Sequence, residues 1–128
     1  MRLELSVLPS RLAVCRLTAG TRPPEWALAG SFLSVSMTSE ETSIVCEEGR
    51  VTDGVQADTG WRAFKVAGPL DFSLTGILLA IAAPLAEAGV GVFAVSTYDT
   101  DYVLVKHGSL DAAVSALRSA GHVVVLPA

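Results

Sequence analysis

The sequence predicts an α+β fold built from two units of unequal completeness, and two patterns in the chain carry this prediction. Before residue 60, short runs of alternating apolar residues are separated by Pro, Gly and Ser, which is typical of strands and turns. After residue 60, strand-like runs alternate with segments whose apolar residues recur every three or four positions, as they do in amphipathic helices. The second half should therefore contain the helices.

In the first half we expect strands over residues 3–8, 11–17, 32–37 and 42–47. Between the second and third of these, Pro23 and Pro24 can open one or two helical turns that run through Trp26 and Leu28. The polar segment 49–60 has no periodicity and several Gly, so we expect a connecting loop. Residues 1–60 thus predict a degenerate subdomain of order β-α-β-β with a stunted helix.

In the second half we expect a strand over residues 61–67 and then a helix capped by Ser73 or Thr75 and ended at Gly89. Strands at 90–96 and 102–106, a second helix starting from Ser109, and a final strand at 122–126 follow. Residues 61–128 thus have the order β-α-β-β-α-β, whose crossovers imply a mixed or antiparallel sheet with both helices on one face. The two halves read as a weak internal repeat.

Composition limits the classes of partner. Half of the 128 residues are hydrophobic and 17% are charged, an apolar excess that favours burial against a second copy in a homodimer. The net charge of −4 and the scattered Lys and Arg disfavour nucleic acid and anionic membranes as partners. The N-terminal segment has no long apolar core, and the apolar run 77–86 is far shorter than the ~20 residues that span a bilayer. We expect a cytoplasmic protein with Cys15 and Cys46 reduced.

No motif of a catalytic or metal site is present. The chain has no G-x-S-x-G, H-E-x-x-H, C-x-x-C or glycine-rich phosphate loop. His107 and His122 stand apart from acidic residues, and with Cys15 and Cys46 they lack the short ligand pairs of structural zinc. We therefore expect a protein that is not an enzyme and that has no cofactor and no metal.

The segment 69–101 indicates where a small ligand could bind. Gly76 lies at the start of the expected helix, where backbone N–H groups are free to bind an anion such as a carboxylate. The alternative is a tight turn that needs Gly for its own dihedral angles. Asp99 and Asp101 flank Thr100 in an extended segment, so both carboxylates could face one cation, or they could simply solvate a turn. Asp71 could serve either the helix dipole or a ligand.

Pro84 lies inside the expected first helix and removes one backbone hydrogen bond. The carbonyl that it frees belongs to Ala80, on a helix rich in Ala. This thin face could admit another helix or the ammonium group of a ligand. The alternative is a kink that wraps the helix over the sheet.

The words FSLTGI (72–77) and APLAEAGVGVFAVSTYDTDYVLV (83–105) resemble the ACT domain, a regulatory module of amino-acid metabolism that binds small molecules. The similarity is to the CASTOR-type arginine sensors, their bacterial ACT-like relatives and, more loosely, the ACT pairs of aspartokinases. It implies a ferredoxin-like fold with two ACT-like subdomains, the first degenerate, and a ligand held where two such stretches meet. Because Leu74 and Ala80 depart from the arginine-sensor pattern, the resemblance implies amino-acid binding in general.

Together, these arguments predict a non-catalytic sensor module that binds an amino acid or similar small zwitterion. The N–H groups of residues 75–78 would hold the carboxylate, and Asp101 with Ser96 or Thr97 the amino or side-chain end. The expected contacts, those implied by the resemblance included, are Ser73, Leu74, Thr75, Gly76, Ile77, Ala80, Ile81, Ser96, Thr97 and Asp101. The alternative is an interaction scaffold of the same fold, whose pocket is closed by Phe72, Leu74 and Ile77 and whose partner is another protein.

Overall fold

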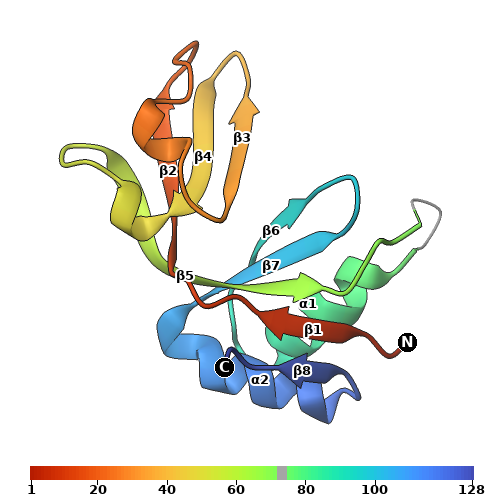
Figure 1. Ribbon diagram of the computed structural model, residues 1–128. Coiled ribbons are helices and arrows are strands. Elements are labelled where there is room, and N and C mark those ends of the chain that lie inside the picture. The colour runs from red at the N-terminus through yellow and green to blue at the C-terminus, as the bar shows by residue number, and fades with distance from the viewer. Residues whose placement is uncertain (72–74) are drawn as a thin grey trace. The chain divides into compact units, whose positions relative to one another are not determined.

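A computed structural model describes residues 1–71 and 75–128 and divides the chain into two compact units (Figure 1). One unit comprises Met1–Pro9 and Arg62–Ala128, and the other comprises Ser10–Trp61. This division differs from the expected boundary at residue 60 in one respect. The first nine residues belong with the second half of the chain, because the N-terminal strand β1 (Glu4–Val7) pairs there with two strands.

The larger unit contains the strand order β8-β1-β5-β7-β6. Its strands are β1, the end of β5 (Gln56–Val66), β6 (Phe93–Ser96), β7 (Asp101–Lys106) and β8 (Val123–Val125). Leu5 of β1 lies opposite Val66 in an antiparallel ladder and opposite Val124 in a parallel one. The expected β-α-β-β-α-β order is therefore confirmed from β5 to β8, with β1 inserted between its first and last strands.

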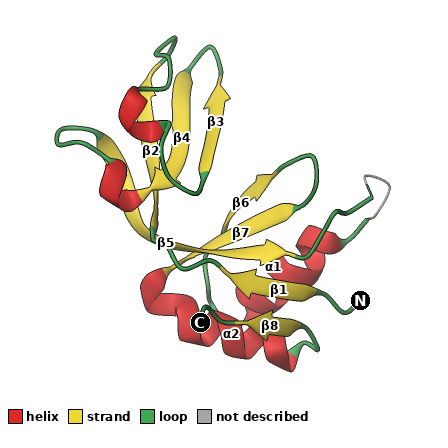
Figure 2. Ribbon diagram, in the orientation of Figure 1, coloured by secondary structure: helices red, strands yellow, loops and turns green. Residues whose placement is uncertain are grey.

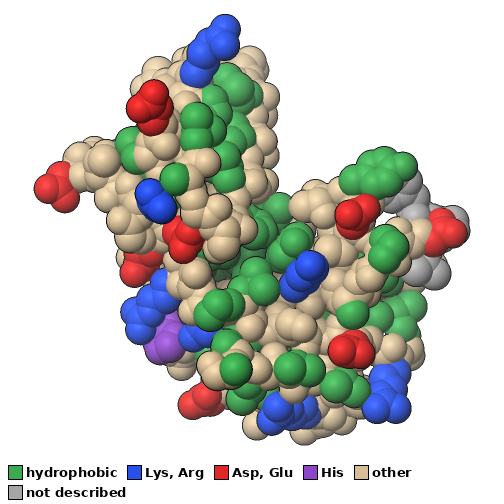
Figure 3. All heavy atoms as spheres, in the orientation of Figure 1, with side chains coloured by type: hydrophobic (Ala, Val, Ile, Leu, Met, Phe, Trp, Pro, Cys, Tyr) green, Lys and Arg blue, Asp and Glu red, His purple; other side chains and the backbone are tan. Residues whose placement is uncertain are grey.

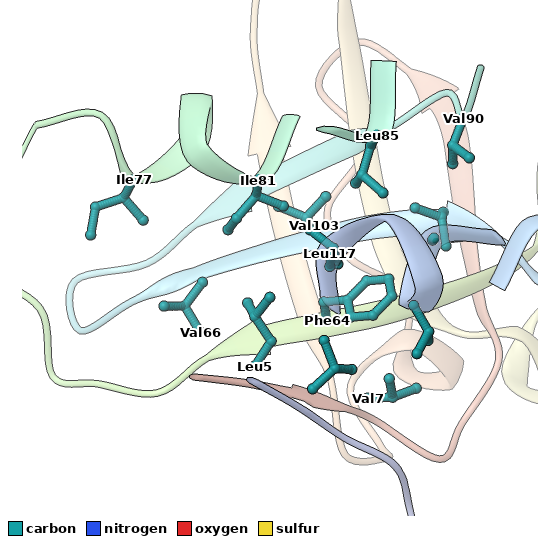
Figure 4. Packing of buried hydrophobic residues seen from close by; sticks show 14 residues of the cluster. Leu5, Val7, Phe64, Val66, Ile77, Ile81, Leu85, Val90, Val103 and Leu117 are labelled. Carbon is teal, nitrogen blue, oxygen red and sulfur yellow. The ribbon is translucent and has the colours of Figure 1, made fainter. Parts of the chain in front are cut away.

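The two helices of this unit, α1 (Ile77–Glu87) and α2 (Leu110–Ser119), cover one face of the sheet (Figure 2). In Figure 4, Ile77, Ile81 and Leu85, which recur every four residues, point from α1 toward the strands. Fully burying a side chain of this size contributes about 1.5–3 kcal/mol, so this core holds the unit together. The core residues are Leu5, Val7, Phe64, Val66, Ile77, Ile81, Leu85, Val90, Val103, Val105, Ala113, Val114, Leu117 and Val124.

The backbone group freed by Pro84 has a partner within the protein. The imidazole Nε2 of His122 lies 2.9 Å from the carbonyl oxygen of Ala80, and the N–H of Leu3 donates to Nδ1 of the same ring at 3.0 Å. These two bonds together place the ring proton on Nε2. His122 is buried, so one side chain satisfies polar groups of α1 and of the N-terminal segment at once.

The smaller unit has the antiparallel strand order β3-β4-β2-β5. It contains β2 (Leu12–Thr18), η1 (Glu25–Ala27), β3 (Leu33–Met37), β4 (Glu41–Glu47), η2 (Glu48–Arg50) and the start of β5. The short helical turn η1 lies where the paired prolines predict it. The buried residues of its core are Ala13, Cys15, Ala27, Ile44 and Cys46.

The expected loop over residues 49–60 is only partly a loop, because β5 already begins at Gln56. Gln56, Ala57 and Asp58 pair with β2, and the register then shifts by one residue before Trp61 lies opposite Leu12. Gly60, with φ of +79°, falls at this bulge, and its N–H donates to the Glu48 carboxylate at 2.6 Å. Backbone pairing thus makes a strand from residues whose side chains gave no strand pattern.

Cys15 and Cys46 lie buried together in the smaller unit and are free thiols. Burial raises the pKa of the Cys15 thiol, and it raises the pKa of Cys46 to about 11 with further help from neighbouring Cys15. Both side chains therefore act as small apolar residues of the core.

Candidate functional site

A cleft of about 330 Å³ opens in the larger unit between the start of α1 and the turn that joins β6 to β7. It brings together segments that are some twenty residues apart in sequence, at the edge of the sheet where β6 and β7 meet. The described residues that line it are Leu70, Asp71, Gly76, Ile77, Leu78, Ser96, Thr97, Tyr98, Asp99, Thr100 and Asp101.

The β6–β7 turn is held by its own hydroxyl groups. The N–H of Thr97 donates to the carbonyl of Thr100 at 2.9 Å, and the Thr97 hydroxyl donates to the same oxygen at 3.0 Å. The buried Thr100 hydroxyl donates to the carbonyl of Val66 at 2.6 Å, which ties the turn to the end of β5. One wall of the cleft is therefore fixed in place before any ligand arrives.

The loop after β5 packs closely on this turn. The N–H of Leu70 donates to the carbonyl of Asp99 at 2.6 Å, and the peptide bond between Gly68 and Pro69 is cis. A Cβ atom on Gly68 would lie 3.0 Å from the Asp99 carbonyl oxygen and 3.1 Å from Thr100 Cβ. Gly68 therefore permits the close approach that brings Asp71 to the cleft.

The helix start forms the opposite wall. Gly76 is the N-terminal cap of α1 with φ of +79°, and no side chain caps this helix among the residues that the structure describes. Thr75 was one of the two expected caps, but its side chain is exposed and makes no capping hydrogen bond. The other expected cap, Ser73, lies outside the described residues. The first N–H groups of α1 thus have no intrahelical acceptor, and Ile77 and Leu78, which carry two of them, line the cleft.

A Cβ atom on Gly76 would have no neighbour within 4 Å, so the space beside it is open. What requires Gly there is its left-handed backbone conformation. This finding supports the alternative that Gly serves its own dihedral angles, and it leaves the cleft accessible as well.

The cleft is polarised. Its described lining includes the carboxylates of Asp71, Asp99 and Asp101 but no Lys or Arg. The opposite wall carries the N-terminal end of a helix, which is electropositive. A cleft with these two ends suits a molecule that carries a negative and a positive group, although exposed carboxylates interact weakly because water screens them.

Of the expected contacts, the cleft brings together Gly76, Ile77, Ser96, Thr97 and Asp101. Ser73 and Leu74 lie outside the described residues, as does Phe72 of the alternative closed pocket. Ala80, Ile81 and Thr75 do not line the cleft. Ile81 is fully buried in the core, and the Ala80 carbonyl is paired with His122.

The structure adds residues that the sequence did not single out as contacts. Asp99, which could have been a solvated turn residue, lines the cleft beside Asp101, as does the 80% exposed Tyr98. Asp71 joins them from the loop after β5. The two-residue spacing of Asp99 and Asp101 indicated that both carboxylates could face one cation. No sequence pattern predicted that Tyr98 or Leu70 would line the cleft.

Outside the cleft, the described residues show neither a membrane-spanning helix nor a metal site. No described helix is long and apolar enough to cross a membrane, and no group of three His, Cys, Asp or Glu side chains among residues 1–71 and 75–128 could hold a metal ion. On the face seen in Figure 3, side chains of Lys and Arg are interspersed with those of Asp and Glu.

Comparison with known proteins identifies the class. The sequence model of the ACT domain matches residues 56–119, half of the chain, and the chain belongs to this family. ACT domains are typically regulatory modules that bind small molecules such as amino acids. A second model, of an N-terminal domain, matches residues 10–54, close to the limits of the smaller unit. The expected ACT-type α+β fold is confirmed.

Particular relatives refine this class. Protein Atu0741 from Agobacterium tumefaciens is 39% identical, its structure superposes with a TM-score of 0.94, and the match covers 100% of this chain and 96% of that protein. The human protein named cytosolic arginine sensor for mTORC1 subunit 1 is 34% identical over 59 residues, or 45% of this chain. The match spans only 18% of that sensor's length.

The fold also recurs in regulatory parts of enzymes. The regulatory subunit of aspartate kinase from Thermus flavus superposes with a TM-score of 0.62 over 91% of this chain and 96% of the subunit, at 11% identity. The aspartate kinase of Clostridium acetobutylicum gives 0.68 at 14% identity, over 91% of this chain and 33% of the kinase. At such identities the likeness concerns the fold alone.

Proposed function

We propose that this chain is a non-catalytic, cytoplasmic regulatory module that binds an amino acid in the cleft between the start of α1 and the β6–β7 turn. The observation that carries the proposal is the polarity of the cleft, which has on one wall the start of α1, where no described side chain caps the helix, and on the other Asp101 with Asp71 and Asp99. An amino acid is a small molecule whose negative carboxylate suits the helix start and whose positive ammonium group suits the carboxylates of the opposite wall.

The two walls have separate tasks in this proposal. The α-carboxylate accepts hydrogen bonds from the N–H groups of Ile77 and Leu78, where the helix dipole also favours negative charge. Asp101 attracts the ammonium group, or a cationic side chain, with the hydroxyls of Ser96 and Thr97 beside it. Water competes at exposed groups, so affinity requires that all these contacts form together.

The relatives support the class of ligand. One of them is named as an arginine sensor, and the matched domain family typically binds amino acids. Most of the residues that line the cleft are exposed in the single chain, and in our proposal a second copy in a homodimer closes it. Neither catalysis nor a cofactor is part of the proposed role.

Thermal-shift screening against the proteinogenic amino acids tests the proposal. A ligand that binds only the folded state raises its stability by RT ln(1 + [L]/Kd), about 2.7 kcal/mol at one hundred times Kd. We expect a rise in Tm with one or a few amino acids. Asp101→Asn should abolish the rise, because the variant retains shape but loses the charge, whereas Asp111→Asn on the exposed side of α2 should preserve it.

Two results would contradict separate parts of the proposal. If no amino acid raises the Tm, the chain is not an amino-acid sensor, and the interaction scaffold becomes the better account. If an amino acid raises the Tm of wild type and of Asp101→Asn equally, the function stands but the ligand does not use the proposed cleft.

A further inference from the structure

The outer strand of the smaller unit, β3, has an open edge. It stands at one end of the strand order β3-β4-β2-β5 and, among the strands that the structure describes, it pairs on one side only, with β4 (Figure 1). Open edges can pair with another chain, and proteins usually block them with charged residues, Pro or bulges. The segment from Ser31 to Ser39, SFLSVSMTS, has no charged residue and no Pro.

The backbone groups that face outward can be identified from the hairpin. The N–H of Thr38 donates to the carbonyl of Glu41 at 2.9 Å, so these two residues form a hydrogen-bonded pair. Hydrogen-bonded and non-hydrogen-bonded pairs alternate along an antiparallel ladder. Ser36 with Ser43 and Ser34 with Val45 are therefore also hydrogen-bonded pairs, whose backbone groups point to β4. The backbone N–H and C=O groups of Leu33, Val35 and Met37 point the other way, to the open edge.

The sequence of this edge is nearly symmetric about Val35. Ser34 and Ser36 flank it, Leu33 and Met37 follow, and Ser31 and Ser39 close the segment. Two copies running antiparallel with Val35 at the centre would place Val35 opposite itself, Leu33 opposite Met37, and Ser34 opposite Ser36. Within residues 33–37 each apolar side chain then meets an apolar one and each hydroxyl meets a hydroxyl, which is the favourable arrangement of cross-strand pairs.

We propose that β3 is a dimerisation edge, which pairs with β3 of a second copy about a two-fold axis at Val35. The outward N–H and C=O groups of Leu33, Val35 and Met37 bond to those of the partner's Met37, the partner's Val35 and the partner's Leu33. The two small sheets thereby join into one. An isologous contact of this kind needs a surface that complements itself, and this segment does.

Charge and burial favour a second copy as the occupant. Two chains of net charge −4 repel each other, and a contact made through an uncharged segment places no like charges face to face. Leu33 is 38% and Met37 52% exposed, while Val35 packs on the core of the unit. Because side chains two apart share a face, the pairing extends this apolar face across the contact and covers both exposed residues.

Charge exchange tests the register. In sedimentation velocity, wild type should be a dimer and L33K/M37K should dissociate, with a rise in the dissociation constant on the order of tenfold or more, since Lys then faces Lys. L33K/M37E should restore the dimer, because Lys faces Glu in this register. Circular dichroism verifies that each variant is folded. A monomeric wild type, or a dimer equally stable in all three proteins, would overturn the proposal.

Disulfide trapping tests the two-fold axis. In the proposed register, Val35→Cys places two cysteines about 5.5 Å apart between their Cα atoms, within the range of a disulfide. Ser39→Cys is the matched control, because its two copies are about 27 Å apart along the strands. We expect oxidation to link V35C chains and to leave S39C and wild type unlinked. Equal linking of V35C and S39C, or none of V35C, would contradict the axis. Ligand binding is read in neither test. A monomeric wild type would remove the dimer from both proposals, whereas the thermal-shift screen with Asp101→Asn tests amino-acid binding in the cleft by itself.

Discussion

The two units differ in how far apart along the chain their paired strands lie. In the larger unit Leu5 pairs with Val66 and with Val124, whereas the ladders of the smaller unit join β2, β3 and β4 within a stretch of about forty residues. Among the described residues, the larger unit has a core cluster of 14 buried hydrophobic residues under two helices, and the core cluster of the smaller unit has five, two of them cysteines.

This difference separates the two kinds of site. In a unit that contains helices, the start of a helix can lie across from a turn between two strands, and the cleft lies between two such segments. A unit built mainly of strands offers an edge with unpaired backbone groups instead. In our two proposals, ligand binding therefore belongs to the larger unit and pairing with a second copy to the smaller one. The following changes test parts of this division.

The largest effect should come from the core beneath α1. Ile81→Ala removes a fully buried side chain and leaves a cavity, so we expect a loss of about 3 kcal/mol in the free energy of unfolding. Leu79 of the same helix is 69% exposed, so Leu79→Ala should lower the free energy of unfolding far less. Urea denaturation measures both. Equal effects would contradict the assignment of Ile81 to the core.

The next effect concerns the hydrogen bonds of His122. His122→Leu leaves the partly buried Leu3 N–H and Ala80 carbonyl without their partner, for an expected loss of about 2 kcal/mol. His107→Leu is the control, because the exposed His107 ring lies 3.3 Å from the guanidinium of Arg62 and its loss should cost about 0.5 kcal/mol or less. If His122→Leu unfolds at the same urea concentration as wild type, the bridge from α1 to the N-terminal segment does not stabilise the fold.

The smaller unit should lose stability in alkali. The folded state raises the pKa of Cys46 from 9.0 to about 11, so it retains the thiol proton where the unfolded chain has released it. The protonated thiol therefore contributes on the order of 2 kcal/mol to the free energy of unfolding. This contribution is complete below pH 9 and is lost as the pH rises toward 11. Urea titrations of wild type and Cys46→Ala at several pH values isolate it. Parallel stability curves for the two proteins would show that the thiol does not titrate as described.

The smallest effect should be that of Gly76→Ala. The new side chain has open space but must adopt φ near +79°, which costs about 1 kcal/mol. Gly91→Ala, whose added Cβ also meets no neighbour and whose φ is not positive, should be neutral or slightly stabilising. Chemical denaturation compares the two variants. A neutral Gly76→Ala would mean that the helix start does not require the left-handed conformation.

Much of the fold could be predicted because it depends on local patterns. Ile77, Ile81 and Leu85 recur at helical spacing and do face the core, and short alternating runs became strands. The insertion of β1 beside β5 could not be predicted, because strand pairing depends on the whole topology. The strand at 56–60 was hidden by polar side chains and by Gly60, which serves a bulge.

The lining of the cleft could be predicted where a helix start and a strand end follow each other in the sequence. Gly76, Ile77, Ser96, Thr97 and Asp101 were expected and line the cleft. Ile81 was expected there from the resemblance, although its spacing already assigned it to the core. Asp71 could not be placed from the sequence, because the close contact of Gly68 with the β6–β7 turn determines where its loop runs.

The most direct test of the central claim is a nuclear magnetic resonance titration of isotope-labelled protein with the amino acid that gives the largest thermal shift. We predict that the backbone amide signals of Ile77, Leu78 and residues 96–101 move together and saturate with one dissociation constant, while those of the smaller unit stay in place. Saturable shifts confined to residues outside the cleft would contradict the claim that an amino acid binds between the start of α1 and the β6–β7 turn.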